Sequence, residues 1–278
     1  MKGSVLINKD EQIKYARFLI ERISQDFLQE GSPYIIQEGF EHLRDLLVLY
    51  GKQTNLLESV LVLIENNMAE EAFILFRSMI NNYMLLEYLT HDNENRVRYN
   101  EFLIQPVKSK LKFLYDFRDG IEKGWISKVE FPDLEKNIIE LEKELEVYGE
   151  KPKINRGKRI YKTTPITISK MAWSDELLFN YYITHYKEAS AFEHSDPSSL
   201  NIYKDQLLEE YNTNGVFTLN LSSTDLNLEE TVLKSSIGVF TMSYLTLLKY
   251  YSNNYEYLIE ERKTKLIEIG LIMNSTNL

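Results

Sequence analysis

The sequence contains no cysteine among its 278 residues. Disulfide bonds, thiolate metal sites and cysteine nucleophiles are therefore excluded, and a reducing compartment fits this composition. Proline and glycine are also scarce, with 6 and 11 residues, which favours long helices over many turned strands. No segment offers about 18 uncharged apolar residues, the length that a membrane-spanning helix needs. The apolar stretch at the start of the sequence is too short for a signal peptide. We therefore expect a cytoplasmic protein without a membrane span.

Positive charge is in the minority, and the formal net charge is −10. This charge disfavours nonspecific attraction to phosphate backbones, so a role with nucleic acid requires a local basic area. The hydrophobic fraction of 44% and the charged fraction of 27% are ordinary for a globular protein and supply a sizeable core. The length fits one large domain, or a core with an insertion.

Apolar residues recur with a helical period along most of the chain. The first half predicts helices over residues 9–30, 33–50, 56–64, 69–89 and 93–120. Gly51 permits a break between the second and third, and the third is apolar nearly all round, which makes it the central helix. Asp92 and Asn93 cap the fifth, and Pro106 is expected to kink it.

The second half of the chain is less regular. Residues 134–148 carry a narrow apolar seam flanked by Glu and Lys, which is typical of a solvated helix and predicts one arm of a hairpin. Residues 149–167 are the least regular, and helices resume at a cap near Asp175 and again near Asn227, the last reaching about Ile272. Residues 215–221 alternate like a strand or an extended loop. We therefore predict an all-α, multi-helix bundle, a single helical domain over residues 1–278 with a helical hairpin insertion at 125–165.

Common enzyme signatures are missing. The sequence has no glycine-rich phosphate loop, no zinc-protease helix motif and no nucleophile elbow. Its four histidines, His42, His91, His185 and His194, do not have the spacing of a metal site. We therefore expect neither a metal nor a cofactor.

A segment from Tyr186 to Leu200 ends a helix and enters a turn. Tyr186, Ser190 and His194 follow one another at intervals of four residues, so they share a helix face and would present hydroxyls and an imidazole to one pocket. The alternative is structural: His194 favours the helix C-terminus, and Ser195 or Asp196 caps the following helix.

Arg77 lies in a strongly apolar helix. A buried guanidinium carries fixed donors and a large desolvation cost, so it needs partners. Either Glu70 or Glu87 pairs with it, or it is kept available for an anion.

The Arg77-Ser78 pair in an apolar helix, followed by Ser-x-x-x-His-Ser-Asp-Pro at residues 190–197, resembles the bacterial helical family catalogued as domain of unknown function 5677. The similarity extends over roughly residues 46–248, and the family often has Glu at the position of Asn81. The resemblance implies a bacterial or phage helical protein associated with defence loci. The chain is also distantly similar to the HEPN ribonucleases, helical bundles that use Arg and His without a metal. It lacks their compact Arg-x4-6-His spacing.

Two functions follow from these residues. If Arg77 and His194 meet, they would support metal-independent cleavage of a phosphodiester in RNA or a nucleotide, with His194 as general acid or base and Arg77 stabilising the charged phosphorane. Ser190 would join them, and Tyr186 and Asn81 would bind substrate. The alternative is a non-catalytic scaffold or sensor that binds another protein. If Arg77, Ser190 and His194 converge in an open cleft, the enzyme is favoured. If His194 is buried and capped, or lies far from Arg77, the scaffold is favoured.

Residues 151–162 are the strongest basic stretch. Lys158 and Arg159 are candidates for binding RNA, and Tyr161 is a candidate to stack on a base. Equally, the stretch follows the acidic residues 135–150 and would neutralise them. The apolar helices 56–64 and 237–251 either pack within one chain or pair in a homo-oligomer.

Overall fold

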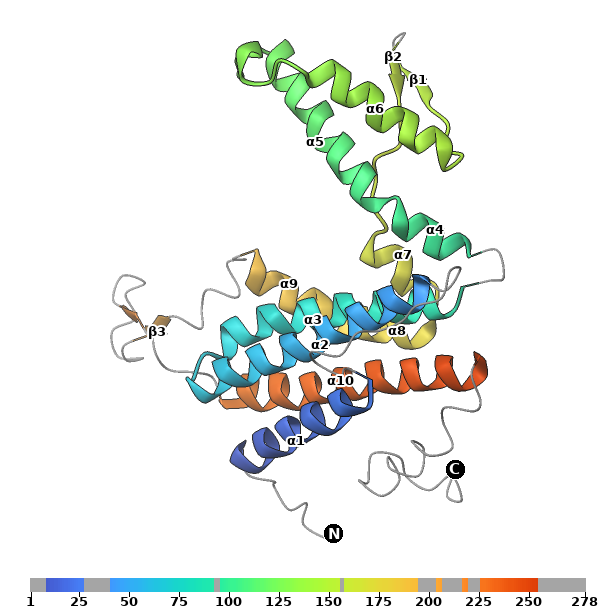
Figure 1. Ribbon diagram of the computed structural model, residues 1–278. Helices are drawn as coiled ribbons and strands as arrows, with labels where there is room; N and C mark the ends of the chain where they lie inside the picture. Colours follow the sequence, from blue (N-terminus) through green and yellow to red (C-terminus); the bar gives the residue numbers. More distant parts are fainter. Residues whose placement is uncertain are drawn as a thin grey trace. The chain divides into compact units, whose positions relative to one another are not determined.

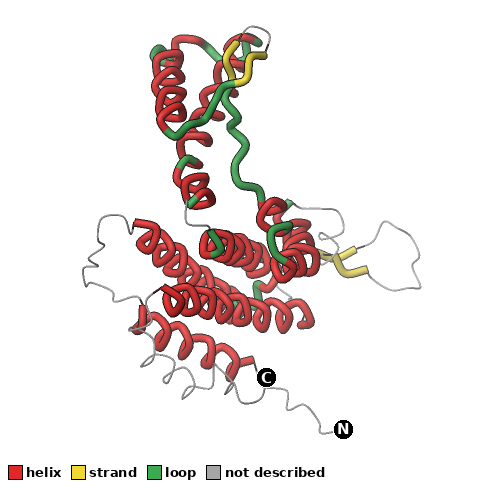
Figure 2. The backbone as a smooth tube through the Cα atoms, turned by 90° about the vertical axis from the view of Figure 1, so that its right-hand side faces the viewer, coloured by secondary structure: helices red, strands yellow, loops and turns green. Residues whose placement is uncertain are grey.

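The structure is a computed structural model that describes residues 9–27, 41–92, 96–155, 158–194, 204–206, 217–219 and 226–254. Helices predominate in this part of the chain (Figures 1 and 2), and its strands are confined to two short antiparallel pairs. The prediction of an all-α bundle is confirmed.

The chain divides into two compact units. Unit 1 combines residues 1–90 and 172–278, and unit 2 is the continuous segment His91–Met171 between them. Unit 2 contains two helices that pack on each other, α5 (Gln105–Glu122) and α6 (Leu134–Val147), of which only α6 lies within the residues 125–165 where the helical hairpin insertion is predicted. Unit 2 itself begins at His91, before residue 125.

Unit 1 is built on three long helices that pack against one another, α2 (Glu41–Glu65), α3 (Ala69–Thr90) and α10 (Leu226–Asn254). A further helix, α1 (Lys9–Phe27), packs on α2 and α10. Aromatic rings join the long helices: Tyr50 of α2 stacks on Phe240 of α10 with ring centroids 5.8 Å apart. The apolar segment at residues 56–64 lies in this core, as expected, and is the second half of α2.

The expected break at Gly51 is wrong, because α2 continues through it. Leu46, Tyr50, Gln53 and Leu57 are all buried and keep a helical spacing across the glycine. Tertiary packing of this stripe outweighs the cost of about 1 kcal/mol that glycine imposes on a helix interior.

A buried hydrogen-bond network fixes the three long helices relative to one another. The side-chain amide of Gln53 donates to the carbonyl of Met79 and to the hydroxyl of Ser243, both at 3.2 Å. Asn82 donates to the carbonyl of Leu49 at 2.7 Å and to Gln53 Oε1 at 3.0 Å. Because buried polar groups are costly when unpaired, this network favours one register of α2, α3 and α10.

Two helices are long and apolar enough to cross a membrane, α2 and residues Leu226–Tyr250 of α10. Length and composition alone are weak evidence, because the core helix of a soluble protein meets the same criteria. Both helices carry the polar network described above and pack on α3, as core helices do.

A second layer of short helices covers α3: α8 (Glu176–Tyr181), the π-helical turn η2 (Tyr182–Tyr186) and α9 (Lys187–Glu193). The predicted cap is confirmed, since Asp175 accepts hydrogen bonds from the N–H groups of Leu177 and Leu178. Ring contacts show that this layer runs antiparallel to α3, and they pair Tyr83 with Tyr181, Phe76 with His185 and Phe73 with Phe192.

Of the segment expected to alternate like a strand, residues Phe217–Leu219 form β4, which pairs with β3 (Lys204–Gln206). The remainder of residues 215–221 lies outside the described residues, as do residues 28–40 and the end of the expected C-terminal helix.

Unit 2 starts with α4 (Val97–Leu103), and α5 follows after one residue. Pro106 lies in the first turn of α5, so the expected kink is a break between two helices. The 3-10 turn η1 (Lys128–Glu130) precedes α6. After α6 come the antiparallel strands β1 (Lys153–Asn155) and β2 (Lys158–Ile160), and then α7 (Ile168–Ala172).

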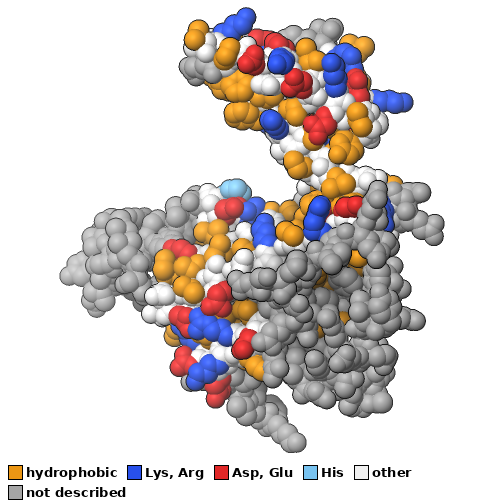
Figure 3. All heavy atoms as spheres, viewed as in Figure 1, with side chains coloured by type: hydrophobic (Ala, Val, Ile, Leu, Met, Phe, Trp, Pro, Cys, Tyr) orange, Lys and Arg blue, Asp and Glu red, His pale blue; other side chains and the backbone are white. Residues whose placement is uncertain are grey.

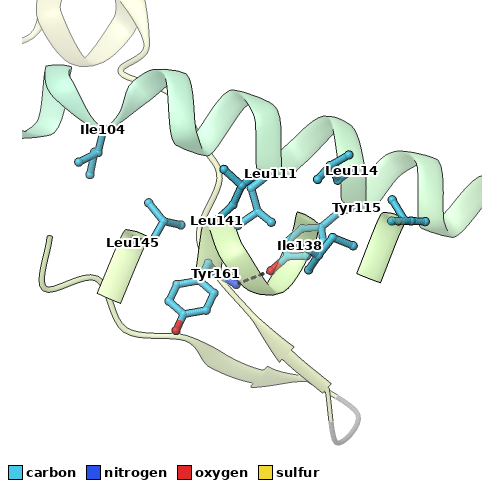
Figure 4. Packing of buried hydrophobic residues seen from close by; sticks show 9 residues of the cluster. Ile104, Leu111, Leu114, Tyr115, Ile138, Leu141, Leu145 and Tyr161 are labelled. Atoms are coloured by element: carbon cyan, nitrogen blue, oxygen red, sulfur yellow. Dashed lines mark hydrogen bonds between the residues drawn. The ribbon is translucent and has the colours of Figure 1, made fainter. Parts of the chain in front are cut away.

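The core of unit 2 lies between α5 and α6 (Figure 4). Leu111 and Leu114 of α5 and Leu145 of α6 are almost fully buried. Tyr161, which follows β2, lies in the same cluster, and its backbone N–H donates to the hydroxyl of Tyr115 at 3.4 Å. Tyr161 therefore anchors the hairpin β1–β2 to the helices of unit 2.

Candidate functional site

Arg77 projects from α3 toward the covering layer and has partners from two of its elements. Its Nη2 donates to the hydroxyl of Tyr186 at 2.7 Å, and its guanidinium carbon lies 4.7 Å from the centre of the Tyr186 ring. Its Nη1 donates to the carboxylate of Glu193 at the end of α9. The expectation that Glu70 or Glu87 pairs with Arg77 is wrong, because the carboxylate comes from the covering layer.

Glu193 connects Arg77 to His194. The same oxygen, Oε2, that accepts from Arg77 lies 3.6 Å from His194 Nε2. The His194 side chain is 70% exposed, whereas that of Arg77 is only 15% exposed. The backbone N–H of His194 donates to the carbonyl of Ser190 at 3.1 Å, which ends α9. We call Arg77, Tyr186, Glu193 and His194 the Arg77 cluster.

Glu193 and Tyr186 do not use all the N–H donors of the Arg77 guanidinium. Arginine has five N–H donors, and Glu193 and Tyr186 use one on each terminal nitrogen. The buried Nε has no partner among the described residues, and the same holds for the buried Oδ1 of Asn81, one helical turn further along α3. Buried polar atoms without partners are uncommon in folded proteins, and a bound water, an ion or a catalytic role are among the explanations for them.

The sequence candidates of the covering layer and of α3 belong to unit 1. Tyr186 and His194 lie in the Arg77 cluster, Ser190 lies half-buried on α9 between them in sequence, and Asn81 follows Arg77 by one turn. The alternative partners for a helix cap, Ser195 and Asp196, lie outside the described residues.

The basic candidates belong to unit 2. Arg159 Nη2 donates to Glu146 of α6 and, at 3.0 Å, to the hydroxyl of Tyr161. These bonds raise the pKa of Arg159, with the bond to Glu146 as the largest cause. The hydrogen bond that the Tyr161 hydroxyl donates to Glu146 at 2.6 Å, followed by the one from Arg159, lowers the pKa of Glu146. Lys158 lies in β2, and its side chain is not among those that the structure describes. The expectation that Tyr161 stacks on a base is wrong, because its ring is 2% exposed.

The face of unit 2 shown in Figure 3, around α5 and α6, mixes Lys and Arg with Asp and Glu. Together with the pair Arg159–Glu146, this mixture fits the interpretation that the basic stretch neutralises the acidic helix before it. Within the described residues, no group of three or more His, Asp or Glu side chains is placed to hold a metal ion.

Sequence reasoning missed Glu193. It lies 116 positions from Arg77, so no local pattern links the two, and its only signal is its place next to His194. The ring of Tyr182 stacks on that of Tyr186 with centroids 5.6 Å apart and an interplanar angle of 21°.

Residues 46–211 match a family described as a family of unknown function, DUF5677, over more than half of the chain. The chain belongs to DUF5677. The match includes all of unit 2 and every member of the Arg77 cluster, and it ends before the limit of about residue 248 that the resemblance suggested. No curated protein and no solved structure matches this DUF5677 chain.

Proposed function

We propose that the Arg77 cluster is the active site of a metal-independent ribonuclease. The observation that carries this proposal is the convergence of a guanidinium and an imidazole on one carboxylate oxygen, Oε2 of Glu193. Two side chains that can both contact one anionic oxygen are suitably placed to contact a phosphate oxygen and its neighbour. The exposure of His194 supports access for a large substrate.

The chemistry requires a proton acceptor and a stabiliser of negative charge. A neutral His194 accepts the proton of a ribose 2′-hydroxyl while the 2′-oxygen forms a bond to phosphorus. The bond from phosphorus to the 5′-oxygen breaks, and this oxygen leaves as a hydroxyl after taking a proton from solvent. Arg77 stabilises the additional charge on the phosphorane, for which the remaining hydrogens of its two Nη atoms are suited. The products are a 2′,3′-cyclic phosphate and a 5′-hydroxyl.

A second function is supported by the way in which Arg77 is bonded. A guanidinium that is 15% exposed and has a carboxylate, a phenol hydroxyl and an aromatic ring as partners also fits a structural ion pair between α3 and α9. In this case the protein is a non-catalytic scaffold or sensor that binds another protein.

We include two broader expectations in the proposal, a cytoplasmic location and a role in bacterial or phage defence. The absence of cysteine supports the first, and the family resemblance supports the second. Phage plating on cells that express the wild-type chain or its His194→Ala variant tests the role in defence. Equal plating on both would count against it.

Degradation of a labelled single-stranded RNA in the presence of EDTA tests the activity. We expect His194→Ala to lower the cleavage rate by roughly 10²- to 10⁴-fold, the range for loss of a general acid or base. Arg77→Lys keeps the charge but loses the planar fork and is also expected to lower the rate. The matched control is His91→Ala, which removes an exposed imidazole from unit 2. Cleavage that is undiminished in His194→Ala, or equally diminished in His91→Ala, would leave the scaffold as the function to pursue.

A further inference from the structure

Next to the Arg77 cluster, aromatic rings and cationic groups alternate along the covering layer. The Tyr186 ring has the guanidinium of Arg77 near it and stacks on the ring of Tyr182. The Tyr182 ring has the ammonium group of Lys187 at 5.3 Å from its centre. The groups therefore follow one another in the order Arg77, Tyr186, Tyr182 and Lys187, from the Arg77 cluster over η2 to the first residue of α9.

The backbone at this place is unusual. Tyr182–Tyr186 is a π-helical turn, a conformation that is rare and is found frequently at functional sites. It holds the two rings at 21° to each other on consecutive turns of the chain. Because both ring positions are set by backbone packed on α3, the stack is formed in advance of any ligand.

The outer end of the stack differs chemically from the inner end. Arg77 at the inner end is largely buried and bonded to Glu193, whereas Lys187 at the outer end is an exposed, flexible side chain. Lys187 can therefore leave the Tyr182 ring at little cost, and a flat group such as a base can take its place on the ring. An ammonium group beside a half-buried tyrosine ring suits a ligand with both an aromatic ring and a phosphate.

We propose that Tyr182 and Lys187 form a subsite for one unpaired nucleotide of single-stranded RNA, with the base on the Tyr182 ring and its phosphate on Lys187. The inference rests on the proposed ribonuclease function and names its substrate class. Single strands are favoured because only an unpaired base presents its face to an aromatic side chain. In a protein with a net charge of −10, a local cation beside the ring is required to attract the strand.

Binding of a fluorescent 2′-O-methyl oligonucleotide to the full chain tests the subsite, because this probe lacks the 2′-hydroxyl and is not cleaved. We expect Tyr182→Leu to weaken binding by roughly 5- to 150-fold, the range for loss of one base stack. Tyr182→Phe and Tyr182→Trp keep an aromatic face and should bind within about 3-fold of the wild type, which separates lost stacking from lost folding. Lys187→Gln should weaken binding and reduce its dependence on salt.

The matched control is Tyr15→Leu, which removes an exposed tyrosine from α1 of the same unit. A duplex of the same sequence should bind more weakly than the single strand. Equal binding of wild type and Tyr182→Leu, equal binding of the duplex, or absence of binding to the oligonucleotide would each overturn the subsite.

The two proposals fail in different ways. Oligonucleotide binding that depends on Tyr182, in a protein that does not cleave RNA, would reject the ribonuclease and retain the subsite. Cleavage that depends on His194, with binding that is indifferent to Tyr182, would retain the ribonuclease and reject the subsite.

Discussion

His185 lies half-buried in the covering layer, with its ring 5.8 Å from that of Phe76 and 6.0 Å from that of Tyr181. Desolvation by this burial lowers the pKa of His185 below its ordinary value, and the negative charge of Glu188 acts in the opposite direction. The folded protein therefore favours the neutral imidazole more than the unfolded chain does, and the unfolded chain takes up a proton at a higher pH.

Because of this pKa shift, His185 contributes a pH dependence to the free energy of unfolding. Since the unfolded state binds more protons below the ordinary histidine pKa of about 6.5, the contribution of His185 is complete above that pH and is lost as the pH falls toward the folded-state pKa. We expect His185→Phe, which keeps the ring contact with Phe76, to lose less stability than the wild type between pH 7.5 and pH 5.5. Urea unfolding at both pH values measures the difference, with His91→Phe as control. If the wild type and His185→Phe lose the same stability between pH 7.5 and pH 5.5, this expectation is contradicted.

At the scale of single residues, the sequence identified Arg77, Tyr186 and His194 because polar groups in apolar helices and at helix ends stand out locally. Glu193 did not stand out, since one more glutamate in an acidic chain carries no signal of its own. Tyr161 was misjudged for a related reason. Its basic neighbours suggested an exposed ring, but its burial depends on α5 and α6, which pack on it from elsewhere in the chain.

Among the elements, α10 carries a glycine in its interior and α6 is followed by one. At Gly238, an added Cβ meets nothing within 4 Å. At Gly149, the residue after the C-cap of α6, φ is +80°, a left-handed conformation that favours glycine. The same substitution should therefore have opposite effects at the two positions.

We expect Gly238→Ala to stabilise the protein by about 0.5–1 kcal/mol, because alanine loses less backbone entropy in a helix. Gly149→Ala should destabilise it by roughly 1–2 kcal/mol, the cost of a left-handed conformation for a residue with a Cβ. Thermal or urea unfolding of the two variants measures both changes. A loss of stability in Gly238→Ala would mean that α10 has less room at this position than its surroundings indicate.

Element boundaries were predictable where a residue constrains its own backbone. Asp175 acts locally, through a side chain that caps the first turn, and it marked a helix start correctly. Pro106 also acts locally, through its missing N–H, but it lies in the first turn of a new helix and does not kink a continuous one as expected. Gly51 only permits a break, so the buried stripe on α2 decided the outcome. Alternation pointed to the segment that contains β4, whereas β1, β2 and β3 are three residues long, too short for alternation to identify them.

At the scale of the whole molecule, unit 2 is a continuous segment with its own core, inserted between the two halves of unit 1. The amino-acid composition does not change near residues 90 and 172, where unit 2 begins and ends. The sequence therefore predicted a shorter insertion, at residues 125–165. A unit with its own hydrophobic core is expected to open as a cooperative whole.

This arrangement predicts that core mutations act within their own unit. Leu145 of unit 2 and Leu57 of unit 1 are both fully buried, so each Leu→Ala substitution should cost about 2–5 kcal/mol in its unit. Hydrogen exchange measured by mass spectrometry should show faster exchange across α5 and α6 in Leu145→Ala, with exchange in α2, α3 and α10 unchanged. In Leu57→Ala, the pattern should be reversed. If either substitution accelerates exchange equally in both sets of helices, the two units unfold as one, and the Arg77 cluster would depend on unit 2 for its stability.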